Sequence, residues 1–274
     1  MARDISDEQT GDRLFIMSIG KCFHLLECFN TAQRALTLTE LAQISHFTTS
    51  TVQRLTHTLC SLGYLRQNPN TRAYLLSSKM LEFGHSVLAA DQVREIAEPH
   101  LQLLNQESRE TVNLMKLEGD EIVYVSRFTS PHPVSVNLHV GSRLPAFCSA
   151  AGRAILANIP PEQAQAILAK KRVAMTKHTV TDLRGLNAIL ERARRDMFVI
   201  NDQEAYLGDI SAAAPIFDGD GEVSSAINIA VPSSRWTAVR VNKELVPMLL
   251  DCARRISRDL DNSNQRNARR GPRV

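Results

Sequence analysis

The 274-residue sequence predicts an α+β protein with two folded domains, and three patterns support this prediction. Residues 48–62, wound as a helix, have one apolar face and one polar face without a carboxylate. Two short strands follow that helix directly. After about residue 110 the apolar residues alternate instead of recurring at helical spacing, which indicates an antiparallel sheet with helices around it. The length suits two domains that each bury a core.

Residues 15–77 are predicted to form a winged helix-turn-helix domain, because a β-hairpin follows three closely spaced helices. The apolar residues of the first helix, including Ile19 and Phe23, recur at helical spacing, and Leu62 falls on the apolar arc of the third helix. The elements, in chain order, are a helix at 18–29, a short helix capped by Thr37 or Thr39, a helix capped by Thr48 or Thr49 and ended by Gly63, and strands at 64–66 and 73–76.

The polar face of residues 48–62 predicts a helix that reads DNA. In a major groove Gln53 favours adenine and Arg54 favours guanine, while the alternative for Arg54 is a phosphate contact. Between Arg13 and Lys79 seven basic and two acidic residues give a net charge of +5, against +3 for the whole chain, as phosphate neutralisation requires. The candidate DNA contacts are Thr49, Ser50, Gln53, Arg54 and His57 on the helix, and Arg66 and Arg72 in the wing.

Residues 78–91 are predicted to form a linker helix, and residues 92–260 a domain that binds a small-molecule effector. Residues 1–14 and the basic tail 261–274 are expected to be disordered because they are polar and charged. Within 92–260, helices are predicted at 92–108, 149–158, 161–171 and 183–197, with a last helix at 241–260, and strands at 111–118, 121–128, 134–140, 213–217 and 223–231.

The effector site is predicted at residues 148–152, where the capping residue Ser149 precedes small residues at a helix start. A ligand carboxylate can approach backbone N–H groups there, at the positive end of the helix dipole. The alternative is tight helix packing without a ligand. Leu138 and Phe147 are candidates to pack against an apolar ring of the ligand, and each also fits a plain core position.

Five motifs occur in order along the chain, namely LTELA at 38–42, STVQRL at 50–55, LGY at 62–64, Pro145 with AGRAILA at 151–157, and AAPI at 213–216. Taken together over about residues 15–255, they resemble the IclR family of bacterial transcription regulators. More loosely, residues 120–127 and 140–146 resemble the branch of that family that controls aromatic-acid and β-ketoadipate catabolism. The resemblance implies a winged-helix domain, a GAF-like effector domain and a homodimer that often pairs into a tetramer.

The same resemblance also implies which residues contact the effector. Family members often have an acid where Asn201 stands and a serine where Ala230 stands, so the implied site repels an anion less and offers one hydroxyl fewer. The family's basic residue two places before Ser211 is here Asp209, which leaves the local charge open. The implied contacts are Ala150, Ala151, Asn201, Ser211, Asn228 and Ala230.

The sequence therefore predicts a transcriptional regulator, not an enzyme, whose operator affinity or activity is controlled by a small carboxylate such as an aromatic acid or a catabolic intermediate. The expected partners are double-stranded operator DNA, the effector, further copies of the chain and RNA polymerase. No cofactor, metal or membrane is expected, and a cytoplasmic location follows from the lack of a signal-peptide core and of about 20 consecutive apolar residues. The rival hypotheses are a small-molecule-binding enzyme with Cys148 as nucleophile and a winged-helix scaffold that binds only protein.

Overall fold

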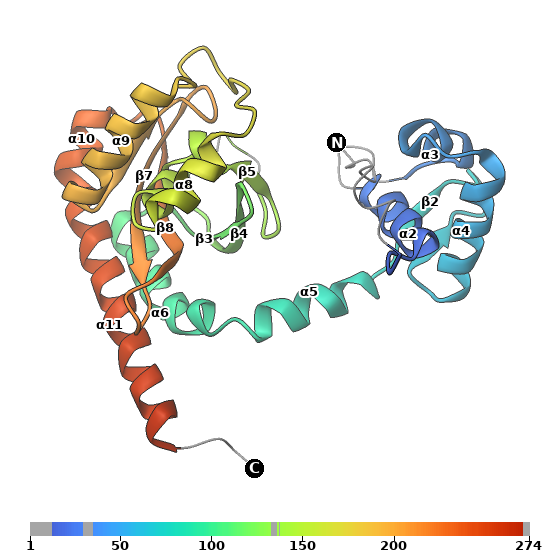
Figure 1. Cartoon of the computed structure of the whole chain (residues 1–274), viewed down its shortest axis with the longest axis horizontal. Helices are drawn as coiled ribbons and strands as arrows, with labels where there is room; N and C mark the ends of the chain where they lie inside the picture. The colour runs from blue at the N-terminus through green and yellow to red at the C-terminus, as the bar shows by residue number, and fades with distance from the viewer. Residues whose placement is uncertain (1–12, 30–34, 133–135, 137, 271–274) are drawn as a thin grey trace. The chain divides into compact units, whose positions relative to one another are not determined.

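A computed structural model describes residues 13–29, 35–132, 136 and 138–270 (Figure 1). The chain divides into two compact units, Met1–Ala90 and Asp91–Val274. Each unit is described by itself below. Among the described residues, no helix is long and apolar enough to cross a membrane.

The first unit is a winged helix-turn-helix domain, as the sequence predicts. Thr37 begins the second helix through a capping box, in which Thr37 Oγ1 accepts from Glu40 N–H at 3.3 Å and the Glu40 carboxylate accepts from Thr37 N–H at 2.7 Å. Thr48 caps the third helix. The elements are α2 (Met17–Glu27), α3 (Leu38–Ser45), α4 (Thr49–Ser61), the antiparallel strands β1 (Leu65–Gln67) and β2 (Tyr74–Leu76), and α5 (Met80–Ala89).

The core of the first unit leaves much apolar surface uncovered. Leu25, Leu41 and Val52 are fully buried where α2, α3 and α4 meet. Ile19 and Phe23, by contrast, are 51% and 63% exposed, although they recur at the same helical spacing as the buried residues of α2. Leu62 is likewise exposed. The physical reason is that α3 and α4 cover only one side of α2, and α5 buries none of its side chains.

The second unit contains a six-stranded antiparallel sheet in the order β5, β4, β3, β8, β7, β6. Its central pair is β3 with β8, which joins hairpins more than 80 residues apart in the chain. The elements are α6 (Gln92–Ser108), β3 (Thr111–Glu118), β4 (Glu121–Phe128), β5 (Arg143–Pro145), the short 3-10 helix η1 (Ala146–Cys148), α7 (Ala150–Leu156), α8 (Pro161–Leu168), α9 (Leu183–Asp196), β6 (Val199–Asp202), β7 (Asp209–Phe217), β8 (Val223–Pro232), α10 (Ala238–Glu244) and α11 (Val246–Arg270).

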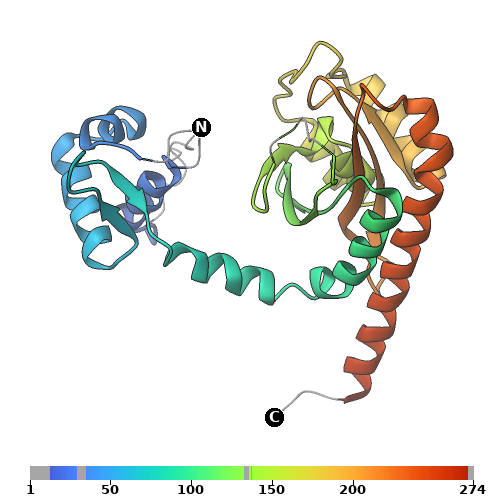
Figure 2. The same ribbon diagram turned by 180° about the vertical axis from the view of Figure 1, so that it is seen from behind.

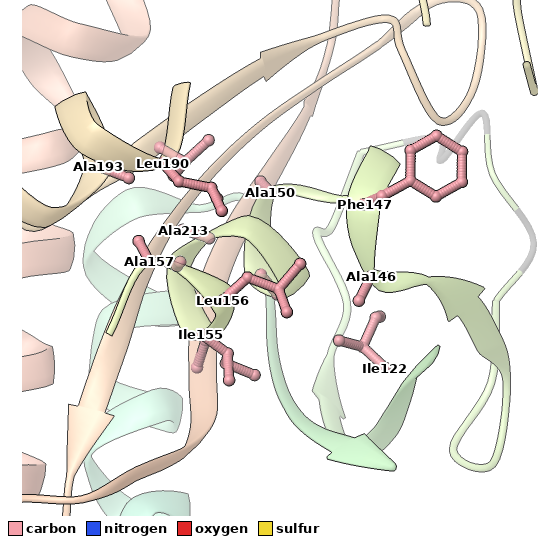
Figure 3. Close-up of a cluster of buried hydrophobic side chains, with 14 of the residues drawn as sticks. Ile122, Ala146, Phe147, Ala150, Ile155, Leu156, Ala157, Leu190, Ala193 and Ala213 are labelled. Atoms are coloured by element: carbon pink, nitrogen blue, oxygen red, sulfur yellow. The ribbon is translucent and has the colours of Figure 1, made fainter. Parts of the chain in front are cut away.

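Both faces of this sheet are covered. Helices α6 and α11 pack together and contact β3, β4, β7 and β8, and α11 runs along the sheet in Figure 2. Helix α7 packs on β7 and β8, and its side chains form one buried apolar cluster with Ala213 and Ala226 of those strands (Figure 3). Because side chains alternate along a strand, Asn228 lies on the same face as Ala226.

The structure corrects three predictions for this unit. The expected strand at 134–140 lies partly outside the described residues, residues 138–140 form no strand, and the third strand is β5 instead. Strand β6 was not predicted. The expected last helix is two helices, α10 and α11, and α11 continues to Arg270, so disorder is wrong for 261–270. Gln92 Nε2 donates to Ser263 Oγ at 3.0 Å, and no helix-breaking residue occurs before Gly271.

The packing of η1 against α7 generates a testable prediction at Gly152. A Cβ atom there would lie 2.2 Å from the carbonyl oxygen and 2.4 Å from the Cα of Ala146. Gly152→Ala must therefore push the two helices apart, and we expect it to lower the free energy of unfolding by about 3 kcal/mol in urea denaturation followed by circular dichroism.

Gly84→Ala is the matched control, since its Cβ would meet nothing within 4 Å and it lies inside a helix. We expect that control to be neutral or to stabilise by about 0.5–1 kcal/mol. Equal stability of the two variants would contradict the packing argument.

Candidate functional site

The exposed face of α4 presents polar side chains without an acid among them. Within the described ranges, the hydroxyls of Thr58 and Ser61 donate to the backbone carbonyls of Arg54 and His57. The side chains of Arg54 and His57 take no part in these bonds, so both remain free for an external partner. Gln53 is also exposed and lies one helical turn before His57. The structure brings together all five predicted helix contacts on this exposed surface, namely Thr49, Ser50, Gln53, Arg54 and His57.

Arg54 differs from the other polar residues of α4 in its position. It borders a hollow that Thr51 and Thr58 of α4 line together with Met17 and Phe23 of α2. Gln53 and His57 do not border that hollow. Arg54 therefore lies at the flank of the polar face, next to α2.

The wing carries its two predicted cations on the surface. Arg66 lies on β1, and Arg72 follows the turn between the strands with φ of 59°. Asn68 Oδ1 accepts from the N–H groups of Asn70 and Thr71 at 2.9 and 3.1 Å, which closes the turn. Both arginines are exposed.

The second unit contains a cavity of about 50 Å³ between the sheet and the start of α7. The predicted residue Phe147 lies outside its lining; it is a 6% exposed member of the buried apolar cluster, and its ring points away from the labelled residues of α7 in Figure 3. The predicted residues that line the cavity are Leu138, Ser149, Ala150, Ala151, Asn201, Ser211, Asn228 and Ala230.

The start of α7 offers two backbone donors to this cavity. Ser149 Oγ accepts from Gly152 N–H at 3.1 Å and so caps the helix, as predicted. Within the described part of the chain, no hydrogen bond satisfies the N–H groups of Ala150 and Ala151. Their small side chains leave these two groups accessible from the cavity.

A row of hydrogen-bonded polar residues crosses four strands along the cavity wall. Arg127 Nη1 donates to Asn113 Oδ1 at 2.8 Å, and Asn113 Nδ2 donates to Asn228 Oδ1 at 2.7 Å. Asn228 Nδ2 then donates to Ser211 Oγ at 2.6 Å. We call these four residues the donor row. Because Ser211 Oγ accepts from Asn228, its own hydroxyl proton is free to point at a ligand.

Arg127 and Asn113 were missed in the sequence, although a signal for them exists. Asn113 stands between the apolar residues Val112 and Leu114 and is only 1% exposed, and Arg127 precedes Phe128 in the neighbouring strand. A polar side chain at such a position needs a partner, because burying an unpaired polar group costs free energy. The sequence alone does not show that Asn113 stands opposite both Arg127 and Asn228, since that depends on the strand register.

Asn201 borders the cavity, but its amide is already occupied. Asn201 Nδ2 donates to the carbonyl of Cys148 at 2.7 Å, and Oδ1 accepts from Glu204 N–H at 3.1 Å. These bonds fix β6 to the end of η1. Asn201 therefore positions the start of α7, whereas Ser211 keeps a free hydroxyl proton for a ligand.

Asp209 brings a carboxylate into the same cavity. Burial raises the pKa of Asp209 to about 7, and the nearby charge of Arg127 opposes that rise. Within the described ranges, the carboxylate accepts no hydrogen bond and forms no ion pair. Burial also raises the pKa of Tyr124 and lowers the pKa of Arg127. The cavity thus holds a cation, a carboxyl group that titrates near neutrality and a tyrosine hydroxyl.

A buried ion pair holds α7 in place behind the cavity. Arg153, which is 1% exposed, donates from Nη1 and Nη2 to the two carboxylate oxygens of Glu204 at 2.5 and 2.6 Å, and from Nε to the carbonyl of Phe147 at 2.7 Å. Neighbouring Cys148 is fully buried, and that burial raises its pKa to about 11. Its thiol therefore stays protonated at neutral pH, which argues against the rival role of a nucleophile.

Comparison with known proteins agrees with both units. Residues 18–69 match the model of the IclR helix-turn-helix domain, and residues 85–258 match that of the bacterial transcriptional regulator IclR C-terminal domain. The Pca regulon regulatory protein of Pseudomonas putida is 32% identical over 92% of this chain and 86% of its own length.

Two solved structures resemble this one closely. A putative transcriptional regulator from Rhodococcus sp. RHA1 is 31% identical with a TM-score of 0.80, covering 91% of this chain and all of that one. An IclR homolog from Microbacterium hydrocarbonoxydans, solved in complex with 4-hydroxybenzoate, is 25% identical with a TM-score of 0.76, covering 89% of this chain and 98% of that one.

Proposed function

Because the chain belongs to the IclR family of bacterial DNA-binding transcriptional regulators, we propose that a small aromatic carboxylate, bound in the cavity of its second unit, controls how it acts on its operator. The family and these relatives are regulators, not enzymes. The observation that carries the effector proposal is the donor row, which presents a half-buried cation and a free hydroxyl proton to the cavity. The 4-hydroxybenzoate complex of a homolog supports the same class of ligand.

In this proposal α4 enters the major groove of the operator. Gln53 and His57 project from the middle of its exposed face, where they can reach base edges. Arg54 at the flank of that face, and Arg66 and Arg72 in the wing, are assigned to phosphates. This assignment chooses between the two roles that the sequence leaves open for Arg54.

We propose that the regulator works in the cytoplasm as a homodimer, or as a tetramer of two dimers, with RNA polymerase as a further partner. Support for self-association comes from apolar side chains that the first unit leaves open. Phe23 on α2 is 63% exposed, and Leu81 and Val87 on α5 are 72% and 68% exposed. Contact between copies of the chain would remove such apolar side chains from water. A dimer would read two half-sites about one helical turn apart, or a multiple of that spacing.

The carboxylate is proposed to accept hydrogen bonds from Ser211, Asn228 and the N–H groups of Ala150 and Ala151, with Leu138 against the ring. A cavity that holds benzene has a volume of roughly 150 Å³, about three times the present volume. The lining must therefore move when the ring enters. A ligand that binds one conformation more tightly shifts the protein toward it, as regulation by an effector requires. A difference of about 1.4 kcal/mol in effector binding between two conformations is enough to change DNA affinity tenfold.

The DNA assignment predicts different consequences for two neighbouring residues. In fluorescence anisotropy with an operator selected from random DNA, Arg54→Ala is expected to weaken binding to operator and to unrelated DNA by the same factor, since phosphates carry no sequence information. The same variant should also lower the number of counterions released on binding, measured from the slope of log affinity against log salt, by about one. Gln53→Ala is expected to lose about tenfold of discrimination at one base position.

Arg192→Ala, which removes an exposed arginine of α9, is the control and should leave DNA binding unchanged. Relaxed specificity at a single base position in Arg54→Ala would assign Arg54 to a base instead.

The effector proposal is tested by isothermal titration with benzoate. The double variant Ser211→Ala and Asn228→Ala removes the free hydroxyl and its partner, and we expect it to weaken binding at least about tenfold. Ser224→Ala, on the exposed side of β8, is the matched control and should bind like the unchanged protein. Retained affinity in the double variant would rule out this part of the cavity as the site.

Asp209 predicts that benzoate binding depends on pH. The anion is repelled once Asp209 ionises, so affinity should be full below pH 7 and fall as the pH rises through the pKa of about 7. The groups that face Asp209 are Arg127 and Tyr124 from β4 and Tyr206 from the preceding loop. We expect about a tenfold loss between pH 6 and pH 8.5 in calorimetric titrations. Asp209→Asn should abolish the dependence, and a flat profile for the unchanged protein would contradict the prediction.

A further inference from the structure

The cavity has two chemically different ends. One end is the donor row, in which Arg127 supplies a positive charge and Ser211 a free hydroxyl proton. The other end is Asp209, which lies two residues before Ser211 on β7. Residues two apart point to the same face of a strand, and their Cα atoms are roughly 7 Å apart. A ligand that spans this distance meets donors at one end and a carboxylate acceptor at the other.

Two polar groups at the Asp209 end lack partners. The Asp209 carboxylate makes no hydrogen bond or ion pair within the part of the chain that the structure describes. Tyr124 is 5% exposed and lines the cavity, and its hydroxyl makes no hydrogen bond within that same part. Both groups line the cavity, so a ligand there can supply the polar partner that the chain does not.

We infer that the effector is a hydroxy acid whose carboxylate lies against the donor row and whose hydroxyl donates a hydrogen bond to Asp209, which makes Asp209 the residue that determines effector specificity. This inference rests on the proposed function, because it needs a carboxylate effector in this cavity. It adds a contact for the end of the ligand that lies opposite the carboxylate. The Tyr124 hydroxyl can donate to the oxygen of the same ligand hydroxyl.

The charges at the site favour a hydroxyl over the other groups of similar size. A second carboxylate would place two anions together at Asp209, and like charges in contact are strongly unfavourable. A cationic group would be repelled by Arg127, whose charge already lowers the pKa of Asp209. A neutral ring edge would displace water from the Asp209 carboxylate and the Tyr124 hydroxyl without pairing them, and sites built to hydrogen-bond a hydroxyl reject ligands that lack it.

Three acids of matched size test the inference on the full chain by isothermal titration at about pH 8, where Asp209 is ionised. They are 4-hydroxybenzoate, benzoate and terephthalate, which differ only in the group opposite the carboxylate. We expect 4-hydroxybenzoate to bind about tenfold or more tightly than benzoate, and terephthalate to bind most weakly. In Asp209→Ala the hydroxyl preference should fall below about threefold, and terephthalate should gain affinity.

Asp220→Ala, an exposed acid in the β7–β8 turn, is the matched control and should keep the order of the three acids. Equal binding of benzoate and 4-hydroxybenzoate, an unchanged hydroxyl preference in Asp209→Ala, or an equal loss for all three acids would overturn the inference and leave the proposed function standing. No binding of any of the three by the unchanged protein would overturn the proposed aromatic carboxylate, and this inference with it.

Discussion

The pairing of β3 with β8 determines what the second unit can bind. These strands come from opposite ends of the domain sequence, and their register places Asn113 directly opposite Asn228. The side chains of that pair connect Arg127 on β4 to Ser211 on β7, so one half-buried guanidinium is linked to a hydroxyl three strands away. A shift of one residue would turn every member of one strand to the other face, and the donor row would be lost.

The start of α7 depends on a second set of constraints. Gly152 lets the helix approach η1 closely, and Arg153 donates hydrogen bonds to the Glu204 carboxylate and to the Phe147 carbonyl. Removing one partner of a buried ion pair leaves an uncompensated charge, so this arrangement is costly to break. Glu204 also accepts from the N–H of Val180 at 2.9 Å. One carboxylate therefore connects the cavity wall to a surface loop, and a ligand that moves α7 must act on that loop too.

Local patterns were sufficient for most of the fold but only for part of the site. Caps such as Thr37 and Ser149 and the two-faced helix α4 are short-range features, so the sequence predicts the winged helix and most of the sheet. Arg127 joins the site only through pairing across the sheet, which no local pattern encodes. The exposure of Phe23 could not be predicted from the sequence either, because helical spacing shows which residues share a face but not whether another element covers that face.

The two binding surfaces differ in what their unpaired polar groups cost. On α4 the free side chains of Gln53, Arg54 and His57 are exposed, so water satisfies them and the empty surface is stable. In the cavity Asp209 is half-buried and Tyr124 is buried, and this burial disfavours the charged form of each group. A ligand that supplies the missing partners relieves this cost in the folded state alone. Effector binding must therefore stabilise the second unit by RT ln(1 + [L]/Kd), whatever it does to DNA affinity.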